Sequence, residues 1–164
     1  MNSFFPYEKS FLDFFQQRYS PQQLPSISYL EDETNSQNPI GRTAFYNPSE
    51  KNVSIYITGR HVKDILRSLA HELIHHLQCE RGDLNNVGPT HQGYAQDDSH
   101  MRNLEREAYE QGNLCFRDWE DNLKKSDKAL YETIYNDNAF GGNKLMSITD
   151  WKDTEINMLL MEKW

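Results

Sequence analysis

The chain has little of what marks several large protein classes. It contains only two cysteines, Cys79 and Cys115, which are too few for a disulfide framework and are expected to be small buried thiols. No stretch approaches the ~18 consecutive apolar residues of a membrane helix. Residues 1–15 also lack the basic start and the continuous apolar region of a signal peptide. We therefore expect a cytoplasmic protein without a membrane partner.

Positive charge is scarce as well. The chain has 17 Lys and Arg residues against 25 Asp and Glu residues, a formal net charge of −8. A nucleic-acid groove is basic and carries interleaved aromatic side chains, so this balance argues against a nucleic-acid partner. The length of 164 residues suits one globular domain. We expect that domain to span 1–164, with a core at about residues 25–125 and helical additions at both ends.

The most informative feature that is present is the run His71-Glu72-Leu73-Ile74-His75. On a helix, residues four apart lie one turn above each other. The two imidazoles can then bind one Zn²⁺ at about 2.0 to 2.1 Å. Glu72 would reach a water on the metal and take its proton as general base. The same spacing also occurs on solvated helix faces, so the neighbouring residues must decide.

The neighbours favour a buried helix over residues 62–79. Its apolar residues recur every three or four positions: Val62, Leu66, Leu69, Leu73 and Leu77. This spacing predicts an amphipathic helix that packs on a core. A solvated face would normally be charged, but Glu72 is the only charged residue from Ser68 to Cys79. Arg81-Gly82 is typical of a helix end.

A catalytic zinc needs a third protein ligand, and a second helix from Asp98 to Lys125 offers Glu105. At ~100° per residue, one apolar stripe contains Met101, Leu104, Ala108, Gly112, Cys115, Phe116 and Trp119. Glu105 falls inside that stripe, whereas Glu107 and Glu110 fall outside it. Because a buried carboxylate is costly without a cation, we expect Glu105 to complete the site. The alternative is a Glu105 that pairs with Lys or Arg or extends to the surface.

The motif HELIHH at 71–76, followed by Glu105-Arg106-Glu107-Ala108, resembles the gluzincin metallopeptidases. It is most similar to their minimal forms and to the ExxA-bearing Ste24/HtpX and ImmA/IrrE types. The resemblance implies that His71, His75 and Glu105 hold one Zn²⁺ per chain. These families commonly have Asp or Asn directly after the alanine, to support a zinc-bound histidine. This chain has Tyr109 there, which becomes a candidate contact for the substrate or a ligand.

The preceding residues predict a small sheet, so the expected fold class is α+β and zincin-like. An antiparallel or mixed sheet would precede the two metal-binding helices. Residues 25–32 are expected to form a strand, and 43–46 with 52–58 a hairpin. The resemblance implies that an edge strand aligns an extended substrate, and the best candidate is the strand at 53–58. Further helices are expected at 4–19, at 128–135 and from Thr149 or Asp150 onward.

The polar connection from Gly82 to Asp98 is long enough to form the rim of a cleft. His91, Tyr94 and His100 lie in or next to it and are candidates for stabilising a tetrahedral oxyanion, although ordinary surface positions are the simpler explanation for each. Cys79 lies four residues after His75, on the same predicted helix face as His71 and His75, so its thiol could line the cleft.

These features predict a zinc-dependent endopeptidase that acts on a peptide or protein substrate through a metal-bound water, with Glu72 as base. The alternative is a catalytically idle zinc-binding module of zincin fold that regulates or binds a partner. Two other HExxH classes fit less well. Peptide deformylases need an upstream cysteine ligand, and no cysteine precedes His71. SprT-like peptidases would need His91 or His100 as the third ligand, and neither lies on a strong buried face.

Overall fold

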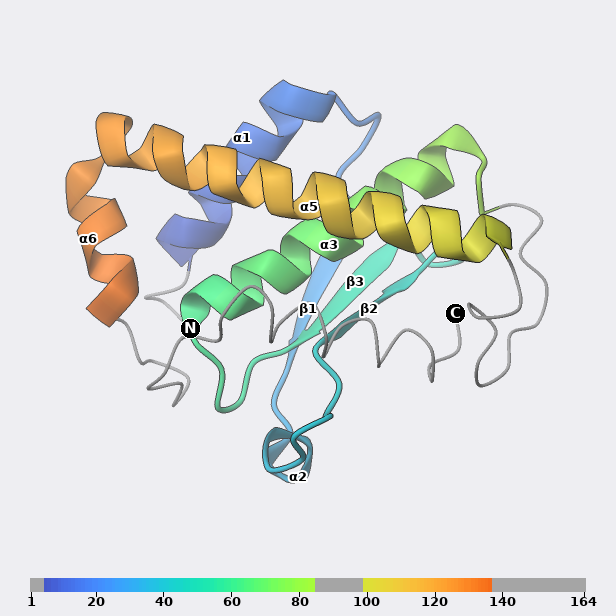
Figure 1. Ribbon diagram of the computed structural model, residues 1–164, viewed down its shortest axis with the longest axis horizontal. Coiled ribbons are helices and arrows are strands. Elements are labelled where there is room, and N and C mark those ends of the chain that lie inside the picture. The colour runs from blue at the N-terminus through green and yellow to red at the C-terminus, as the bar shows by residue number, and fades with distance from the viewer. Residues whose placement is uncertain (1–4, 85–98, 137–164) are drawn as a thin grey trace.

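The computed structural model describes residues 5–84 and 99–136 and shows an α+β fold (Figure 1). The last predicted helix, from Thr149 or Asp150, lies outside the described residues, as do His91 and Tyr94. No described helix has the length and apolar character needed to cross a membrane. In chain order the elements are α1 (Phe5–Tyr19), β1 (Ser26–Leu30), α2 (Glu33–Ser36), β2 (Ala44–Asn47), β3 (Asn52–Tyr56), α3 (Val62–Arg81), α5 (Ser99–Ser126) and α6 (Lys128–Asn136).

The three strands form one mixed sheet in the order β1-β3-β2. β2 and β3 are the predicted antiparallel hairpin, with Tyr46 opposite Val53. On its other side β3 pairs in parallel with β1, with Ile27 opposite Val53. β3 is therefore the central strand, and the prediction that 53–58 is an edge strand for substrate addition was wrong. The hairpin turn is a local signal, whereas the parallel pairing with β1 depends on a connection through α2.

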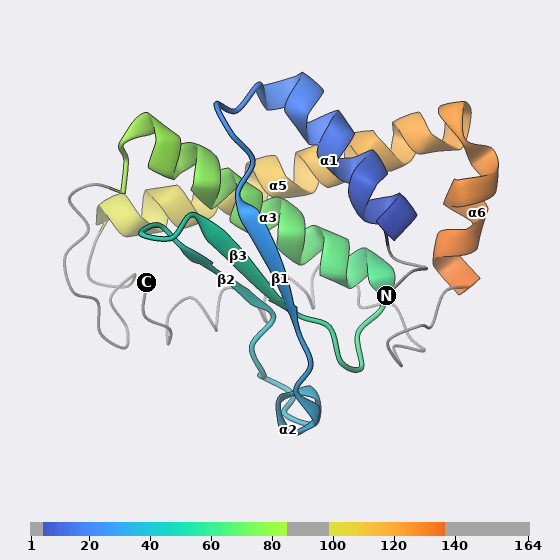
Figure 2. The ribbon, with the colours of Figure 1, turned by 180° about the vertical axis from the view of Figure 1, so that it is seen from behind.

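The sheet, α3 and α5 form three successive layers, as Figures 1 and 2 show from opposite sides. α3 lies on the sheet and contacts β2 and β3, and α5 crosses the far side of α3. The contact between the sheet and α3 is apolar, and on β3 both Val53 and Ile55 are fully buried. α3 is thereby covered on both sides, which explains why even its polar residues are buried.

Both ends of α3 have a clear cause in the sequence. The Nδ1 atom of His61 accepts a hydrogen bond from the backbone N–H of Lys63 at 3.1 Å, which satisfies a donor of the first turn. At the other end Gly82 adopts the left-handed conformation with φ 87°. Its N–H donates to the carbonyl of Cys79 at 3.1 Å, as expected for a glycine that ends a helix. The predicted helix end at Arg81-Gly82 is confirmed.

The buried face of α5 is the stripe that the sequence predicted, with Glu105 inside it and Leu123 added. α1 packs against α5 towards the C-terminal end of α5. Phe11 lies edge-on to Trp119 with ring centroids 5.5 Å apart, and Trp119 Nε1–H donates to Ser10 Oγ at 3.0 Å. The aromatic face of α1 thus meets α5. Aromatic rings prefer such tilted contacts with other rings, and α5 offers them.

Candidate metal centre

Three potential ligand atoms from α3 and α5 meet at one point. His75 Nε2 lies 3.2 Å from His71 Nε2 and 3.2 Å from Glu105 Oε2. The remaining side, from His71 Nε2 to Glu105 Oε2, is 3.3 Å. Glu105 is 30 and 34 residues from the two histidines in the chain. The fold therefore brings together the three residues that the sequence singled out as ligands, and this group can bind a metal ion.

The size of this triangle matches a small tetrahedral cation. An ion with ligand bonds of about 2.0 to 2.1 Å holds neighbouring tetrahedral ligands about 3.3 Å apart. The three sides measure 3.2, 3.2 and 3.3 Å, so the donors need almost no rearrangement. Three protein donors also leave one tetrahedral position for another ligand.

Burial and charge favour a cation at the same point. His71 and His75 are fully buried, and Glu105 is 8% exposed. Burial by itself raises the pKa of Glu105, but the interactions of its carboxylate with the adjacent His75 and His71 side chains outweigh it and lower that pKa to about 2. Its second oxygen, Oε1, is buried without a hydrogen-bond partner among the described residues. An anionic, half-satisfied carboxylate inside a protein is costly unless positive charge lies beside it.

The close crossing of the two helices depends on Gly112. A Cβ atom at this position would lie 3.1 Å from the Cα and N atoms of His71 and 3.2 Å from the carbonyl carbon of Ala70. These are backbone atoms of a buried helix, which cannot move aside easily. Ala108 is also fully buried, one turn before Gly112. The two small residues let α5 approach α3 closely enough for Glu105 to reach the histidines.

Gln78 is a site residue that the sequence analysis missed. Its side chain is fully buried and contacts a ligand directly, since its Oε1 lies 2.8 Å from His75 Nδ1. Its Nε2 donates to the carbonyl of Leu104 at 2.9 Å and to Glu107 Oε1 at 2.8 Å. Its position three residues after His75, on the predicted buried helix, was the one feature of the sequence that pointed to it.

Glu107 lies at the rim of the site and does not touch the donor triangle. Its carboxylate accepts a hydrogen bond from Arg81 Nη2 at 2.6 Å as well as the one from Gln78. The hydrogen bond from Arg81 is the main reason why the pKa of Glu107 is lowered. The predicted helix phase is thus correct, because Glu105 faces the metal site and Glu107 does not. Glu107 is nevertheless more than a surface acid.

Glu72 is 3% exposed and is not one of the three clustered donors. Its role as a general base stays a prediction. Tyr109 is half-buried on α5, one turn after Glu105. His100 is exposed at the start of α5, where its Nε2 bonds to the carbonyl of Asp83 at 3.0 Å. The third candidate contact, His91, lies outside the described residues.

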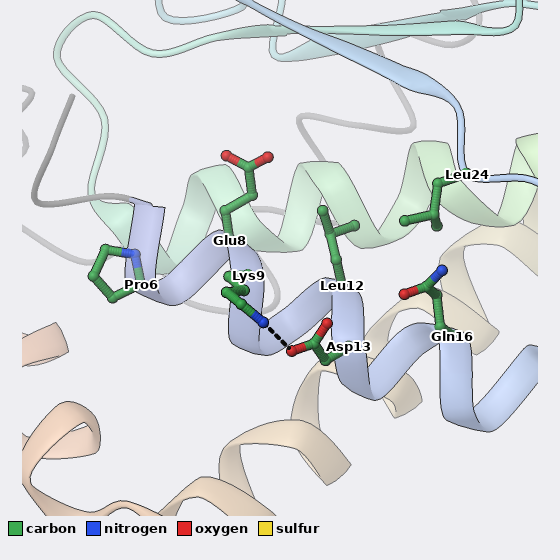
Figure 3. A pocket seen from close by; sticks show the side chains of 7 residues that line it. All are labelled: Pro6, Glu8, Lys9, Leu12, Asp13, Gln16 and Leu24. Atoms are coloured by element: carbon green, nitrogen blue, oxygen red, sulfur yellow. Dashed lines mark hydrogen bonds and ion pairs between the residues drawn. The ribbon is translucent and has the colours of Figure 1, made fainter.

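The remaining candidates lie away from the triangle. Cys79 is half-buried and its thiol faces the carbonyl of Pro48 at 3.9 Å, while Cys115 is buried and both thiols are free. An open depression beside α1 is also separate, because none of the three donors lines it (Figure 3). Its lining residues are Pro6, Glu8, Lys9, Leu12, Asp13, Gln16 and Leu24.

A comparison of the chain with protein-family models, with curated proteins and with solved structures gave no match. The fold and the site therefore define the class by themselves: an α+β protein in which a buried group of two histidines and one glutamate can bind a metal ion.

Proposed function

We propose that this protein is a zinc-dependent peptidase of the gluzincin type, with His71, His75 and Glu105 as the zinc ligands. The observation that carries the proposal is the donor triangle, whose sides of 3.2 to 3.3 Å suit a tetrahedral ion. Two imidazole nitrogens and one carboxylate oxygen are also a common donor set of catalytic zinc. The HExxH spacing on α3 and the ExxA spacing on α5 support the gluzincin assignment.

A zinc ion at this point would supply Lewis-acid activation of a water molecule and of the substrate carbonyl. The other steps belong to the chain itself. His71, His75 and Glu105 would hold the ion through the atoms that meet in the donor triangle. The Glu72 carboxylate accepts a proton from the attacking water and returns it to the nitrogen of the leaving amine. Glu72 directly follows His71 on α3 and is buried, and both facts support this role.

The decisive experiment combines metal analysis with a peptidase assay. We expect about one zinc per chain and cleavage of protein or peptide substrates that stops when a chelator removes the metal. Glu72→Gln should keep the zinc and lose cleavage by a factor of ~10² to 10⁴. Glu110→Gln makes the same chemical change at an exposed position of α5 and should leave both unchanged.

The second candidate function is an idle zinc-binding module that regulates or binds a partner. One observation favours it: the donors His71, His75 and Glu105, together with Glu72, are all at least nine-tenths buried. A site covered in this way suits a structural metal as well as a catalytic one. Stoichiometric zinc without cleavage of any protein or peptide in a broad substrate panel would favour this module over the peptidase.

A further inference from the structure

The buried carboxamide of Gln78 links both ligand helices. Its Nε2 donates to the carbonyl of Leu104, the residue that precedes the ligand Glu105 in α5. Its Oε1 faces Nδ1 of the ligand His75 on its own helix, α3. The side chain of Gln78 therefore contacts the ring of His75 and also the backbone of α5 next to Glu105.

The orientation of this carboxamide follows from its partners. The carbonyl of Leu104 and the carboxylate of Glu107 both accept hydrogen bonds, so the atom between them must be the NH₂ group of Gln78. The oxygen of Gln78 then faces His75 Nδ1, which must carry the hydrogen. In a neutral imidazole only one nitrogen is protonated, so His75 Nε2 keeps its lone pair and directs it at the donor triangle.

We propose that Gln78 is a positioning residue, which fixes the tautomer and the ring orientation of His75 and is itself held by Glu107 and Arg81. The inference rests on the proposed metal site and deepens it. The families that the chain resembles commonly have Asp or Asn directly after the alanine of ExxA, and here Tyr109 occupies that position. Here the carboxylate of Glu107 supports His75 indirectly, through the carboxamide of Gln78. The hydrogen bond that Gln78 Nε2 donates to Glu107 polarises the carboxamide and makes its oxygen a stronger acceptor for His75 Nδ1–H.

The first measurement is zinc affinity, obtained by competition with a chromogenic chelator. Gln78→Leu removes both hydrogen-bonding groups and should weaken zinc binding about 10- to 100-fold, the usual effect of losing such a partner. Glu107→Gln keeps an acceptor for Gln78 and should weaken it less. Gln111→Leu is the matched control, because Gln111 bonds to Tyr19 and not to a ligand. It should bind zinc as the wild type does.

The second measurement does not need the metal. In the metal-free protein, nitrogen NMR of the imidazoles should show His75 protonated at Nδ1 in the wild type and in Gln111→Leu. Gln78→Leu should lose this preference. If Gln78→Leu does not fold, Gln78→Asn carries the same expectation, since it keeps the carboxamide but is one methylene too short to reach His75.

A rescue variant separates positioning from general packing. In Gln78→Glu combined with Glu107→Gln, the total charge is unchanged and a carboxylate still accepts the hydrogen of His75 Nδ1. Zinc affinity and the Nδ1 tautomer should both recover. The proposal is overturned if Gln78→Leu, or Gln78→Asn in its place, keeps the wild-type affinity and tautomer. Should the wild type bind no zinc, the proposed function fails, and the tautomer measurement alone still decides the role of Gln78.

Discussion

Gly112→Ala tests whether the crossing distance between α3 and α5 sets the metal site. The added methyl group would lie 3.1 Å from two backbone atoms of His71 and 3.2 Å from one of Ala70. Ordinary contact between carbon atoms is about 3.5 to 4.0 Å. The two helices must therefore separate locally by roughly 0.4 Å or more, at the residue that carries one of the ligands.

Two effects on stability oppose each other in this variant. Overpacking of a tight interior contact costs about 1 to 3 kcal/mol. Alanine in place of glycine inside a helix returns about 1 kcal/mol. The net loss in the free energy of unfolding is then between about 0 and 2 kcal/mol, which is a modest change.

The effect on the metal site should be clearer. A helix separation of about 0.4 Å would lengthen the side of 3.3 Å between His71 Nε2 and Glu105 Oε2, beyond the tetrahedral spacing. We expect zinc affinity to fall measurably, because a separation of roughly 0.4 Å or more takes up nearly all of the ~0.5 Å within which the groups of such a site must be held. Chelator competition measures the affinity, and urea unfolding of the metal-free protein measures the stability.

Asn103→Ala provides the control, because Asn103 is exposed on the same helix. It improves helix propensity without crowding α3, so it should stabilise slightly and leave zinc affinity unchanged. The reasoning would be refuted if Gly112→Ala stabilised the metal-free protein by about the full 1 kcal/mol and bound zinc as tightly as the wild type. That result would mean that the backbone of α3 at His71 can move away from the added methyl group without disturbing the metal site.

Three further predictions follow from the same geometry. Glu105→Gln should lower zinc affinity by orders of magnitude, whereas Glu110→Gln should not, and equal affinities by chelator competition would exclude Glu105 as a ligand. His71→Ala and His75→Ala should each abolish stoichiometric zinc in elemental analysis, while Glu72→Gln should retain it; loss of metal from all three would contradict the role of Glu72. Burial raises the pKa of Cys115 to about 12, so its thiolate fraction at pH 8 is only about 10⁻⁴. Iodoacetamide should then label half-buried Cys79 well before Cys115 in the native protein, and equal labelling by mass spectrometry would show that Cys115 is accessible.

The three candidate ligands could be predicted because each has a local signal in the sequence. His71 and His75 are four residues apart on a helix whose periodicity is visible in the sequence. Glu105 stands out as the one acid inside the apolar stripe of α5, and the structure buries that stripe residue by residue. Helical phase depends only on nearby residues, so no knowledge of the tertiary structure is needed to obtain it.

The parts that could not be predicted depend on contacts between distant segments. The central position of β3 requires the parallel pairing with β1, and no residue in either strand specifies the order of the sheet. Gln78 is similar, because a glutamine on a helix carries no signal of its own. Its role appears only when α5 places the carbonyl of Leu104 and the carboxylate of Glu107 beside it. The same contact explains why Glu107, correctly placed outside the stripe, is still connected to the site.

Metal binding and helix packing depend on the same crossing of α3 and α5, so a loss of zinc affinity does not by itself identify a ligand. Gly112 fixes the distance at His71, and Gln78 fixes the orientation of His75. What distinguishes these roles is the combination of readouts. Loss of a ligand removes the metal, loss of Gln78 also shifts the His75 tautomer, and crowding at Gly112 changes the stability of the metal-free protein. Glu72→Gln should change none of these three and only the rate of hydrolysis, which is how a general base differs from the residues that build its site.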